Sequence, residues 1–261
     1  MDFNFKKKFG QNFLTDKNLL NSIVSLSNVN KDTVVLEIGP GAGALTEAIL
    51  LQAKKVVSFE IDRELEPILK ENLKDYQNYE IVFKDFMKLS DEEIKSYVGE
   101  DFIVIANLPY YITSPILFKF FELKNKPKSL TIMVQKEYGE RMVALPGESE
   151  YSSLSVLCKY LGNAKIVKHV SRKMFTPPPK VDSCIVHFEF NNEVYDDKLA
   201  KFIKTCFAMR RKTLVNNLSM GLGVDKSKIA QVLSSLNIDV SARAETLSYE
   251  KIRELYDFFK G

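Results

Sequence analysis

The sequence contains few of the residues that form disulfides or hold metal ions. Its 261 residues include three cysteines and two histidines, and the cysteines are widely separated, at Cys158, Cys184 and Cys206. An odd number of distant cysteines favours free thiols in a reducing compartment over a disulfide framework. Because the histidines and cysteines do not cluster, no metal site is expected.

Long apolar runs are also missing. No stretch approaches the roughly 20 apolar residues that a membrane helix needs. The charged start of the chain is not followed by the apolar segment of a secretory signal. These absences predict a cytoplasmic protein. Hydrophobic residues make up 45% and charged residues 27% of the chain, which is typical of a globular protein with one large domain, alone or with a small one.

Acidic residues are absent from two basic segments. Residues 159–180 and residues 198–218 each contain six Lys or Arg and no Asp or Glu, although the net charge of the whole chain is only +3. Such segments are either solvated lysine faces or contacts for a polyanion, and a third basic segment near the amino terminus favours the polyanion. The candidate RNA contacts are Lys6, Lys7, Lys8, Arg172, Lys173, Lys180, Arg210, Arg211 and Lys212.

Short β-rich runs alternate with helical patterns over the first 190 residues. Strands are expected at residues 34–39, 56–62, 81–85, 102–108, 130–135, 164–170 and 182–190, and helices near 15–27, 43–52, 63–74, 113–123, 136–144 and 151–161. Continuous apolar strands suit a parallel sheet buried on both faces, so the pattern predicts an α/β sandwich. After a polar break only helices are expected, near 196–219, 226–236 and 248–260. The predicted domains are therefore residues 1–192 and a small all-α domain of residues 193–261.

Four successive strands end in glycine-rich or polar residues. The first strand leads through Gly39 and Gly41 into a helix, and such a turn lets the backbone approach a ligand closely. Glu60, at the end of the second strand, can accept hydrogen bonds from both hydroxyls of a ribose. Asp85, at the end of the third, can accept from an adenine amine while the aromatic residue after it packs on the base. Because these ends share one sheet edge, a nucleotide-like ligand is expected there. Alone, the glycine turn would also fit a dinucleotide fold or a simple tight turn.

The fourth strand ends in the tetrapeptide Asn107-Leu108-Pro109-Tyr110, which resembles the motif of enzymes that methylate amino groups of bases. An adenine exocyclic amine is a poor nucleophile because its lone pair is delocalised into the ring. The side-chain carbonyl of Asn107 and the backbone carbonyl of Leu108 can accept hydrogen bonds from that amine and aim its lone pair at a methyl group. Pro109 stiffens the turn and Tyr110 offers a stacking face. The alternative is a strand end followed by an ordinary proline turn.

A proline-rich segment precedes the last strand. Phe175 and Thr176 are followed by three consecutive prolines, which cannot join a helix or a central strand, so the segment is expected to be a rigid loop. The loop is either purely structural or presents Phe175 to a flipped base.

These features together resemble known families. The glycine turn, with Glu37 two residues ahead of it, resembles the class I S-adenosylmethionine-dependent methyltransferases, which have a Rossmann-like, mostly parallel sheet of seven strands. Nearly the whole chain is similar to the ribosomal RNA small-subunit adenine dimethyltransferases, through residues 9–14, 135–142, 175–183, 210–218 and 243–248. The resemblance implies that Phe175 stacks on the target adenine opposite Tyr110. It also implies cofactor contacts at Asn12 (His in many relatives), Leu14, Gly39, Gly41, Glu60, Ile61, Asp85, Phe86 and Asn107.

The resemblance also implies a reaction. It is S-adenosylmethionine-dependent dimethylation of the N6 amines of two adjacent adenosines in the 3′-terminal hairpin loop of small-subunit ribosomal RNA. The expected substrate is a pre-ribosomal 30S particle, and the enzyme is expected to be a monomer. Two alternatives stay open: a methyltransferase of large-subunit ribosomal RNA, and a non-catalytic nucleic-acid-binding factor on the same fold. Residues 210–218 and 243–248 favour the small-subunit enzymes. An NAD-dependent oxidoreductase is disfavoured because nothing supplies a hydride-transfer site.

Overall fold

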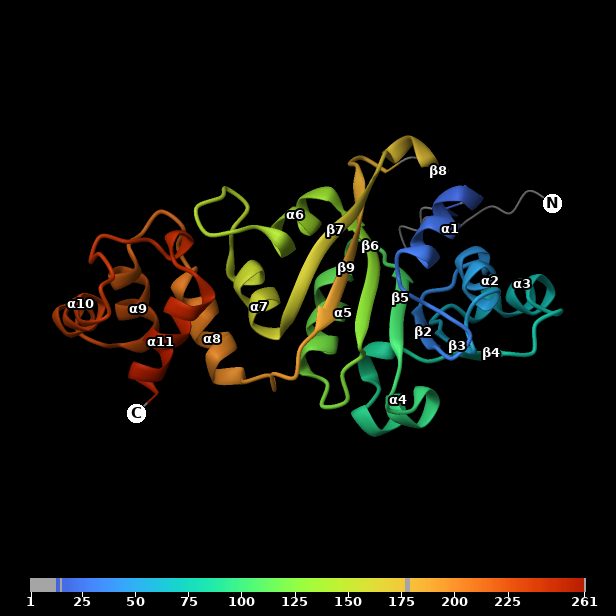
Figure 1. The fold of residues 1–261 in the computed structure, drawn as a ribbon, viewed down its shortest axis with the longest axis horizontal. Helices are drawn as coiled ribbons and strands as arrows, with labels where there is room; N and C mark the ends of the chain where they lie inside the picture. Colours follow the sequence, from blue (N-terminus) through green and yellow to red (C-terminus); the bar gives the residue numbers. More distant parts are fainter. Residues whose placement is uncertain (1–12, 15, 177–178, 261) are drawn as a thin grey trace. The chain divides into compact units, whose positions relative to one another are not determined.

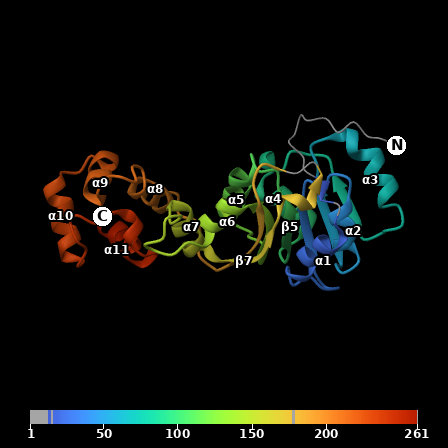
Figure 2. The same cartoon turned by 90° about the horizontal axis from the view of Figure 1, so that it is seen from above.

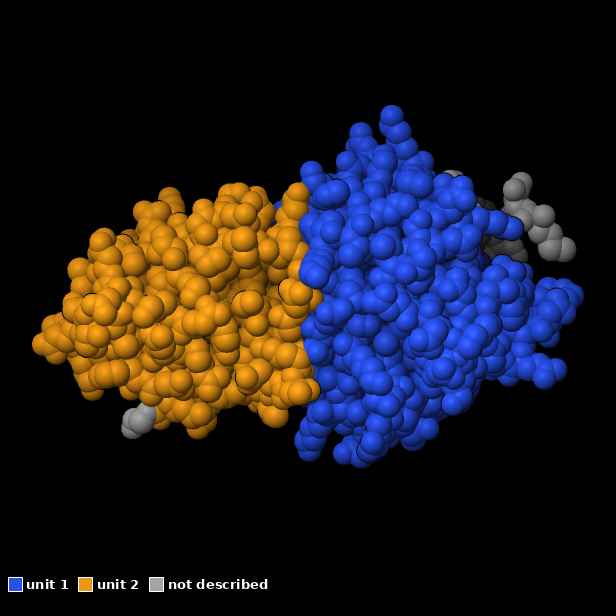
Figure 3. Space-filling view, in the orientation of Figure 1, with its two compact units in different colours: residues 1–139, 165–190 blue, residues 140–164, 191–261 orange. Residues whose placement is uncertain are grey.

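The computed structural model describes residues 13–14, 16–176 and 179–260 (Figures 1 and 2). The candidate residues Lys6, Lys7, Lys8 and Asn12 lie outside these ranges. The chain forms two compact units, which Figure 3 colours separately: unit 1 contains residues 1–139 and 165–190, and unit 2 contains residues 140–164 and 191–261.

Unit 1 is built on a sheet of seven strands in the order β4-β3-β2-β5-β6-β9-β7. Five strands are parallel: β2 (Val34–Ile38), β3 (Lys55–Phe59), β4 (Tyr79–Val82), β5 (Ile103–Asn107) and β6 (Ser129–Gln135). β9 (Ser183–Phe190) runs antiparallel to β6, and β7 (Gly162–Val170) is the edge strand beside it. The predicted seven-stranded, mostly parallel sheet is thus confirmed.

Helices cover both faces of this sheet. One face packs its apolar residues, among them Ile103 and Ile105, against α1 (Lys17–Ser25), α2 (Ala44–Leu50) and α3 (Glu66–Asn72). The other face carries α4 (Asp91–Val98) and α5 (Thr113–Glu122), where Phe59 contacts Tyr97 at a ring-centroid distance of 5.5 Å. α6 (Lys136–Val143) follows β6 directly. Because successive residues of a strand point to opposite faces, the continuous apolar run of β5 can place apolar side chains against the helices on both faces of the sheet.

Among the described residues, α4 is the one α-helix that was not predicted. It begins with a capping box, in which the Ser90 side chain accepts from the Glu93 amide at 3.2 Å while the Glu93 carboxylate accepts from the Ser90 amide at 3.0 Å. A Ser followed three residues later by Glu is a signature of a helix start, so the sequence did contain the signal. The mainly charged composition of the first turn obscured the apolar periodicity.

Unit 2 is helical. It contains α7 (Ser153–Leu161), α8 (Asp197–Cys206), α9 (Leu214–Leu222), α10 (Lys226–Ser235) and α11 (Tyr249–Phe259). The second segment of unit 2 begins at residue 191, two residues before the predicted start of the second domain at residue 193. Unit 2 also includes residues 140–164, which were predicted to belong to the first domain. The reason is long-range packing: the Tyr160 ring stacks on Tyr249, and the Tyr151 hydroxyl donates to the Leu247 carbonyl at 2.8 Å.

The predicted single helix over 196–219 is wrong. Residues 207–213 form a turn between α8 and α9, because the buried Asn217 amide donates to the Cys206 carbonyl at 2.7 Å and accepts from the Met209 amide at 3.2 Å. The Thr213 side chain then caps the new helix. Residues 210–212 consequently lie in this turn and not on a helix face.

The cysteines are buried and free, as predicted. Burial raises the pKa of the Cys158 and Cys206 thiols well above the usual range. In the described part of the chain, no helix is long and apolar enough to cross a membrane, and no group of three or more His, Cys, Asp or Glu residues could hold a metal ion.

Candidate functional site

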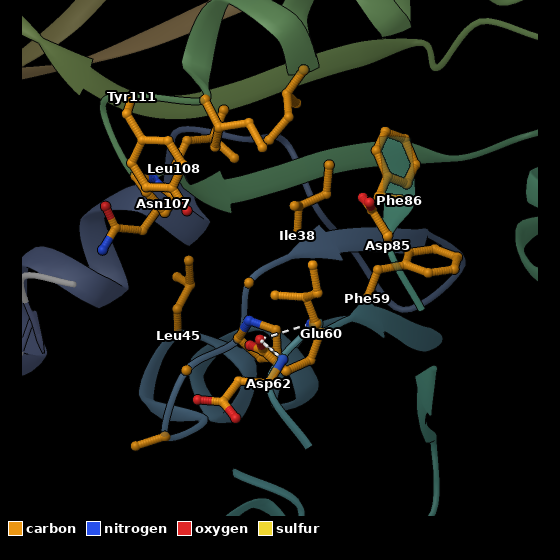
Figure 4. A pocket seen from close by; sticks show the side chains of 18 of the residues that line it. Ile38, Leu45, Phe59, Glu60, Asp62, Asp85, Phe86, Asn107, Leu108 and Tyr111 are labelled. Atoms are coloured by element: carbon orange, nitrogen blue, oxygen red, sulfur yellow. Dashed lines mark hydrogen bonds between the residues drawn. The ribbon is translucent and has the colours of Figure 1, made fainter. Parts of the chain in front are cut away.

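A cavity of about 210 Å³ lies at the carboxyl ends of β2, β3 and β5 (Figure 4). The strand ends were expected to share one edge, and the cavity brings together eleven of the predicted residues. They are Gly39, Gly41, Glu60, Ile61, Asp85, Phe86, Asn107, Leu108, Pro109, Tyr110 and Phe175. Leu14 lies in β1 (Phe13–Leu14), which pairs with β8 (Phe175–Thr176) so that Leu14 is opposite Phe175.

The glycine turn connects β2 to α2 with left-handed backbone conformations. Gly39 has φ +68° and Gly41 has φ +58°, values that other residues adopt only with strain. The Gly39 amide donates to the Phe59 carbonyl at 2.9 Å, which ties the turn to the end of β3. The turn therefore holds bare backbone against the cavity, as the sequence predicted.

Glu60 lines the cavity with a side chain that is almost fully buried. Its Oε1 accepts from the amides of Ile61 and Asp62, each at 2.8 Å, shown as dashed lines in Figure 4. Its Oε2 is buried and has no hydrogen-bond partner among the described residues. Burial raises the pKa of this carboxyl despite the backbone hydrogen bonds, which lower it. A buried acceptor without a donor is costly, so the site fits a ligand that brings hydroxyl donors, such as a ribose.

Asp85 and Phe86 lie on one side of the cavity in Figure 4, away from Asn107. The Asp85 carboxylate accepts from the Met87 amide at 3.0 Å, which fixes its position. Phe86 is buried, with its ring centroid 5.2 Å from that of Phe120. Ile61, in contrast, exposes 62% of its surface at the cavity. An acceptor beside apolar side chains suits a purine base.

The Asn107–Tyr110 segment is held rigidly on the other side. The Pro109 carbonyl accepts from the Ile112 amide at 3.1 Å, and the Tyr110 hydroxyl lies 2.7 Å from the Ser183 hydroxyl of β9. Within the described residues, no hydrogen bond engages the Asn107 side chain, so its carbonyl is free to accept from a ligand. The arrangement of this segment thus fits the predicted hydrogen bonds from an amine to the carbonyls of Asn107 and Leu108.

Phe175 lines the cavity but is only 3% exposed and packs in the hydrophobic core of unit 1. Its stacking role therefore stays a prediction.

Sequence reasoning missed several lining residues, of which Tyr111 is the most exposed aromatic, at 66%. Most of the others adjoin predicted positions in the same loops and could have been included on that ground. The missed lining residues are Leu20, Ile38, Pro40, Ala42, Ala44, Leu45, Phe59, Asp62, Lys84, Met87, Tyr111, Ile112 and Ile116.

The described candidate RNA contacts are exposed and belong to different units. Arg172, Lys173 and Lys180 lie in unit 1 beside β8, where the Arg172 guanidinium donates to the Lys180 carbonyl at 3.1 Å. Residues 210–212 lie in the α8–α9 turn of unit 2, where the Arg210 guanidinium donates to the Ser149 carbonyl. Both groups are accessible to a polyanion.

Glu37, two residues before the glycine turn, is a carboxyl buried in unit 1. Its Oε2 accepts from the hydroxyls of Thr46 and Ser58, each at 2.7 Å, while Oε1 has no hydrogen-bond partner among the described residues. Desolvation raises its pKa to about 7, although the two hydroxyls act in the opposite direction. The carboxyl is therefore protonated in the folded state at mildly acidic pH.

This raised pKa predicts a pH-dependent stability. The folded state holds the Glu37 proton up to about pH 7, whereas the unfolded chain releases it near pH 4.5. Since the folded state binds more protons between these values, its free energy of unfolding should fall as the pH rises from 4.5 to 7, by on the order of 3 kcal/mol. Glu37→Gln should lack this component in urea unfolding at pH 5 and pH 8. Equal pH dependence in the two proteins would contradict the assignment.

Comparison with known proteins gives consistent matches over the whole chain. The family model for ribosomal RNA adenine dimethylase matches residues 2–260. Ribosomal RNA small subunit methyltransferase A from Bacillus thuringiensis (strain Al Hakam) is 43% identical over 267 aligned positions, covering 97% of this chain and 90% of that protein. The protein of the same name from Bacillus mycoides (strain KBAB4) matches equally, with the same identity and coverage.

Two solved structures share the fold. A dimethyladenosine transferase from Plasmodium falciparum has a TM-score of 0.80 and 28% identity, covering 95% of this chain and 98% of that one. The 23S rRNA methyltransferase ErmE has a TM-score of 0.74 and 26% identity, covering 96% of this chain and all of that one. The expected class I methyltransferase fold is thereby confirmed. With the cavity, the tetrapeptide and these whole-length matches in agreement, the chain belongs to the ribosomal RNA adenine dimethylase family.

Proposed function

We propose that this chain dimethylates the N6 amines of two adjacent adenosines in the 3′-terminal hairpin loop of small-subunit ribosomal RNA. One observation carries the proposal: Asn107 and Glu60 line the same cavity, and among the described residues neither the Asn107 side chain nor Glu60 Oε2 has a hydrogen-bond partner. The first suits an adenine amine and the second suits a ribose. A cavity that accepts both brings a nucleoside-bearing methyl donor and a target base together.

The donor is S-adenosylmethionine, whose sulfonium supplies an electrophilic methyl group. Glu60 would accept from its ribose hydroxyls with Oε2, which has no hydrogen-bond partner among the described residues. Asp85 accepts from its adenine amine, and Ile61 packs against the face of that base. The glycine turn leaves room for the rest of the molecule because Gly39 and Gly41 carry no side chain.

The chain's own residues then position the nucleophile. The Asn107 side-chain carbonyl and the Leu108 backbone carbonyl accept both hydrogens of the target amine, so that its lone pair points away from the ring plane. Tyr110, fixed through its hydroxyl to Ser183, stacks on the base from one side. Phe175 is the proposed second wall. As the bond from nitrogen to the methyl carbon forms, the carbon–sulfur bond of the donor would break and leave S-adenosylhomocysteine. The nitrogen becomes cationic, so it loses its proton readily to water and no strong general base is required.

The small-subunit assignment rests on the relatives. Proteins named as small-subunit methyltransferases share 43% identity with this chain, against 26% for the large-subunit enzyme ErmE. The intact tetrapeptide and glycine turn argue against a non-catalytic nucleic-acid-binding factor.

The proposed substrate form is a pre-ribosomal 30S particle in the cytoplasm. The enzyme is proposed to be a monomer, and sedimentation at twice the chain mass would argue otherwise.

The test is methyl transfer to two purified substrates. Small subunits from cells that lack this modification should accept labelled methyl groups from S-adenosylmethionine when the protein is added. Large-subunit particles should accept none. Incorporation into the large subunit alone would overturn the substrate assignment, and incorporation into neither would favour the non-catalytic alternative.

A further inference from the structure

Tyr111 is an aromatic residue of the cavity that the proposed mechanism does not use. It is 66% exposed, whereas Phe59, Phe86 and Phe175, which also line the cavity, are at most 4% exposed. Its neighbour Tyr110 is half-buried and tied to Ser183 through its hydroxyl. Tyr111 is therefore the lining aromatic whose ring is most available to a ligand outside the cavity.

The position of Tyr111 places this ring at the methyl-transfer end. In Figure 4 it lies on the same side as Asn107 and Leu108, opposite Asp85 and Phe86. Its backbone belongs to the turn that the Pro109 carbonyl closes, by accepting from the Ile112 amide at 3.1 Å and from the Thr113 hydroxyl at 3.3 Å. In the described part of the chain no hydrogen bond or ring contact engages the Tyr111 side chain. The backbone position of Tyr111 is thus held, while its ring is left available for stacking.

We propose that Tyr111 stacks on the nucleotide next to the target adenosine. This inference rests on the proposed function. The target base must enter the cavity to reach the Asn107 carbonyl, so the adjoining nucleotide of the RNA is left at the rim, where the exposed ring is. Aromatic side chains that stack on bases bind single-stranded RNA without sequence preference. Because the two target adenosines are adjacent, Tyr111 holds the second while the first is in the cavity.

The first test compares RNA binding with catalysis. Tyr111→Ala should raise the KM for the RNA by about 5- to 100-fold, the range for losing one base stack, while kcat and the affinity for S-adenosylhomocysteine change little. Tyr111→Phe, which keeps the ring, should restore the wild-type KM. Leu51→Ala serves as the control, because Leu51 is a comparably exposed apolar residue of unit 1, at 59%, that does not line the cavity.

The second test observes the stack itself. Two hairpin RNAs are made, each with one of the two adjacent adenosines replaced by fluorescent 2-aminopurine. Binding of the wild-type protein should quench the probe at the position beside the target, and Tyr111→Ala should bind without that quenching. A Tyr111→Ala variant with wild-type KM and undiminished quenching would overturn the role of Tyr111 alone. A wild-type protein that methylates neither the hairpin nor the particle would overturn the proposed function as well.

Discussion

Asn107→Ala should reduce methyl transfer by at least about 10²- to 10³-fold in kcat, the cost of removing one preorganised hydrogen-bonding group from an active site. The amine is a weak nucleophile, so transfer depends on its being held with the lone pair aimed at the methyl group. Alanine removes the side-chain carbonyl and leaves the Leu108 carbonyl in place. Single-turnover rates with saturating RNA and cofactor measure this loss directly.

Glu60→Gln provides the matched contrast to this variant. Glutamine can still accept from the Ile61 and Asp62 amides, but its amino group replaces Oε2, which has no hydrogen-bond partner among the described residues. The affinity for S-adenosylhomocysteine should fall by about 10- to 100-fold, as expected for losing a hydrogen bond to a charged acceptor. Asn107→Ala should keep most of that affinity in calorimetric titration. A wild-type transfer rate in Asn107→Ala would refute the proposed positioning of the amine.

Replacing Arg210, Arg211 and Lys212 with Ala should weaken binding to the particle and flatten its salt dependence. If the α8–α9 turn contacts RNA phosphates, each lost contact lowers the slope of log K against log salt by about 0.7 to 0.9. The triple variant should therefore lose up to about 2 to 3 from that slope. Filter binding at several salt concentrations gives the slope. Because Arg210 also bonds the Ser149 carbonyl, the Arg211 and Lys212 double variant separates RNA contact from loop structure.

A charge-matched control comes from α8 of the same unit. Lys198, Lys201 and Lys204 are exposed on that helix, and their replacement with Ala removes the same charge from unit 2. This variant should keep most of the wild-type slope. An unchanged slope in the turn variant would mean that residues 210–212 are a solvated surface, and equal losses in both variants would indicate a diffuse electrostatic effect.

The sheet, and the convergence of most candidate site residues on one cavity, could be predicted because their signals are local. Buried parallel strands such as β5 are continuous apolar runs, and their carboxyl ends meet at one edge, so the residues that follow them had to converge. Glu60, Asp85 and Asn107 were found in this way. The chemistry of each was inferred from its functional groups, and the structure added that Oε2 of Glu60 has no hydrogen-bond partner among the described residues.

What could not be predicted depends on contacts between distant residues. The turn at 207–213 exists because the Asn217 side chain forms hydrogen bonds with backbone groups up to 11 positions away. The spacing of apolar residues in the sequence does not indicate that contact. Residues 140–164 belong to unit 2 because Tyr151 and Tyr160 pack on residues near 247–249. The exposure of Tyr111 follows from the fold of its turn, since a second aromatic beside Tyr110 would have been equally consistent with a buried position.

The identity of the product tests the account most directly. Small subunits that lack the modification are incubated with the protein and S-adenosylmethionine, their RNA is digested, and the nucleosides are quantified by mass spectrometry. We predict N6,N6-dimethyladenosine at two residues per particle, both within the 3′-terminal hairpin loop, and none with Asn107→Ala. Methylation confined to another position or another base would contradict it.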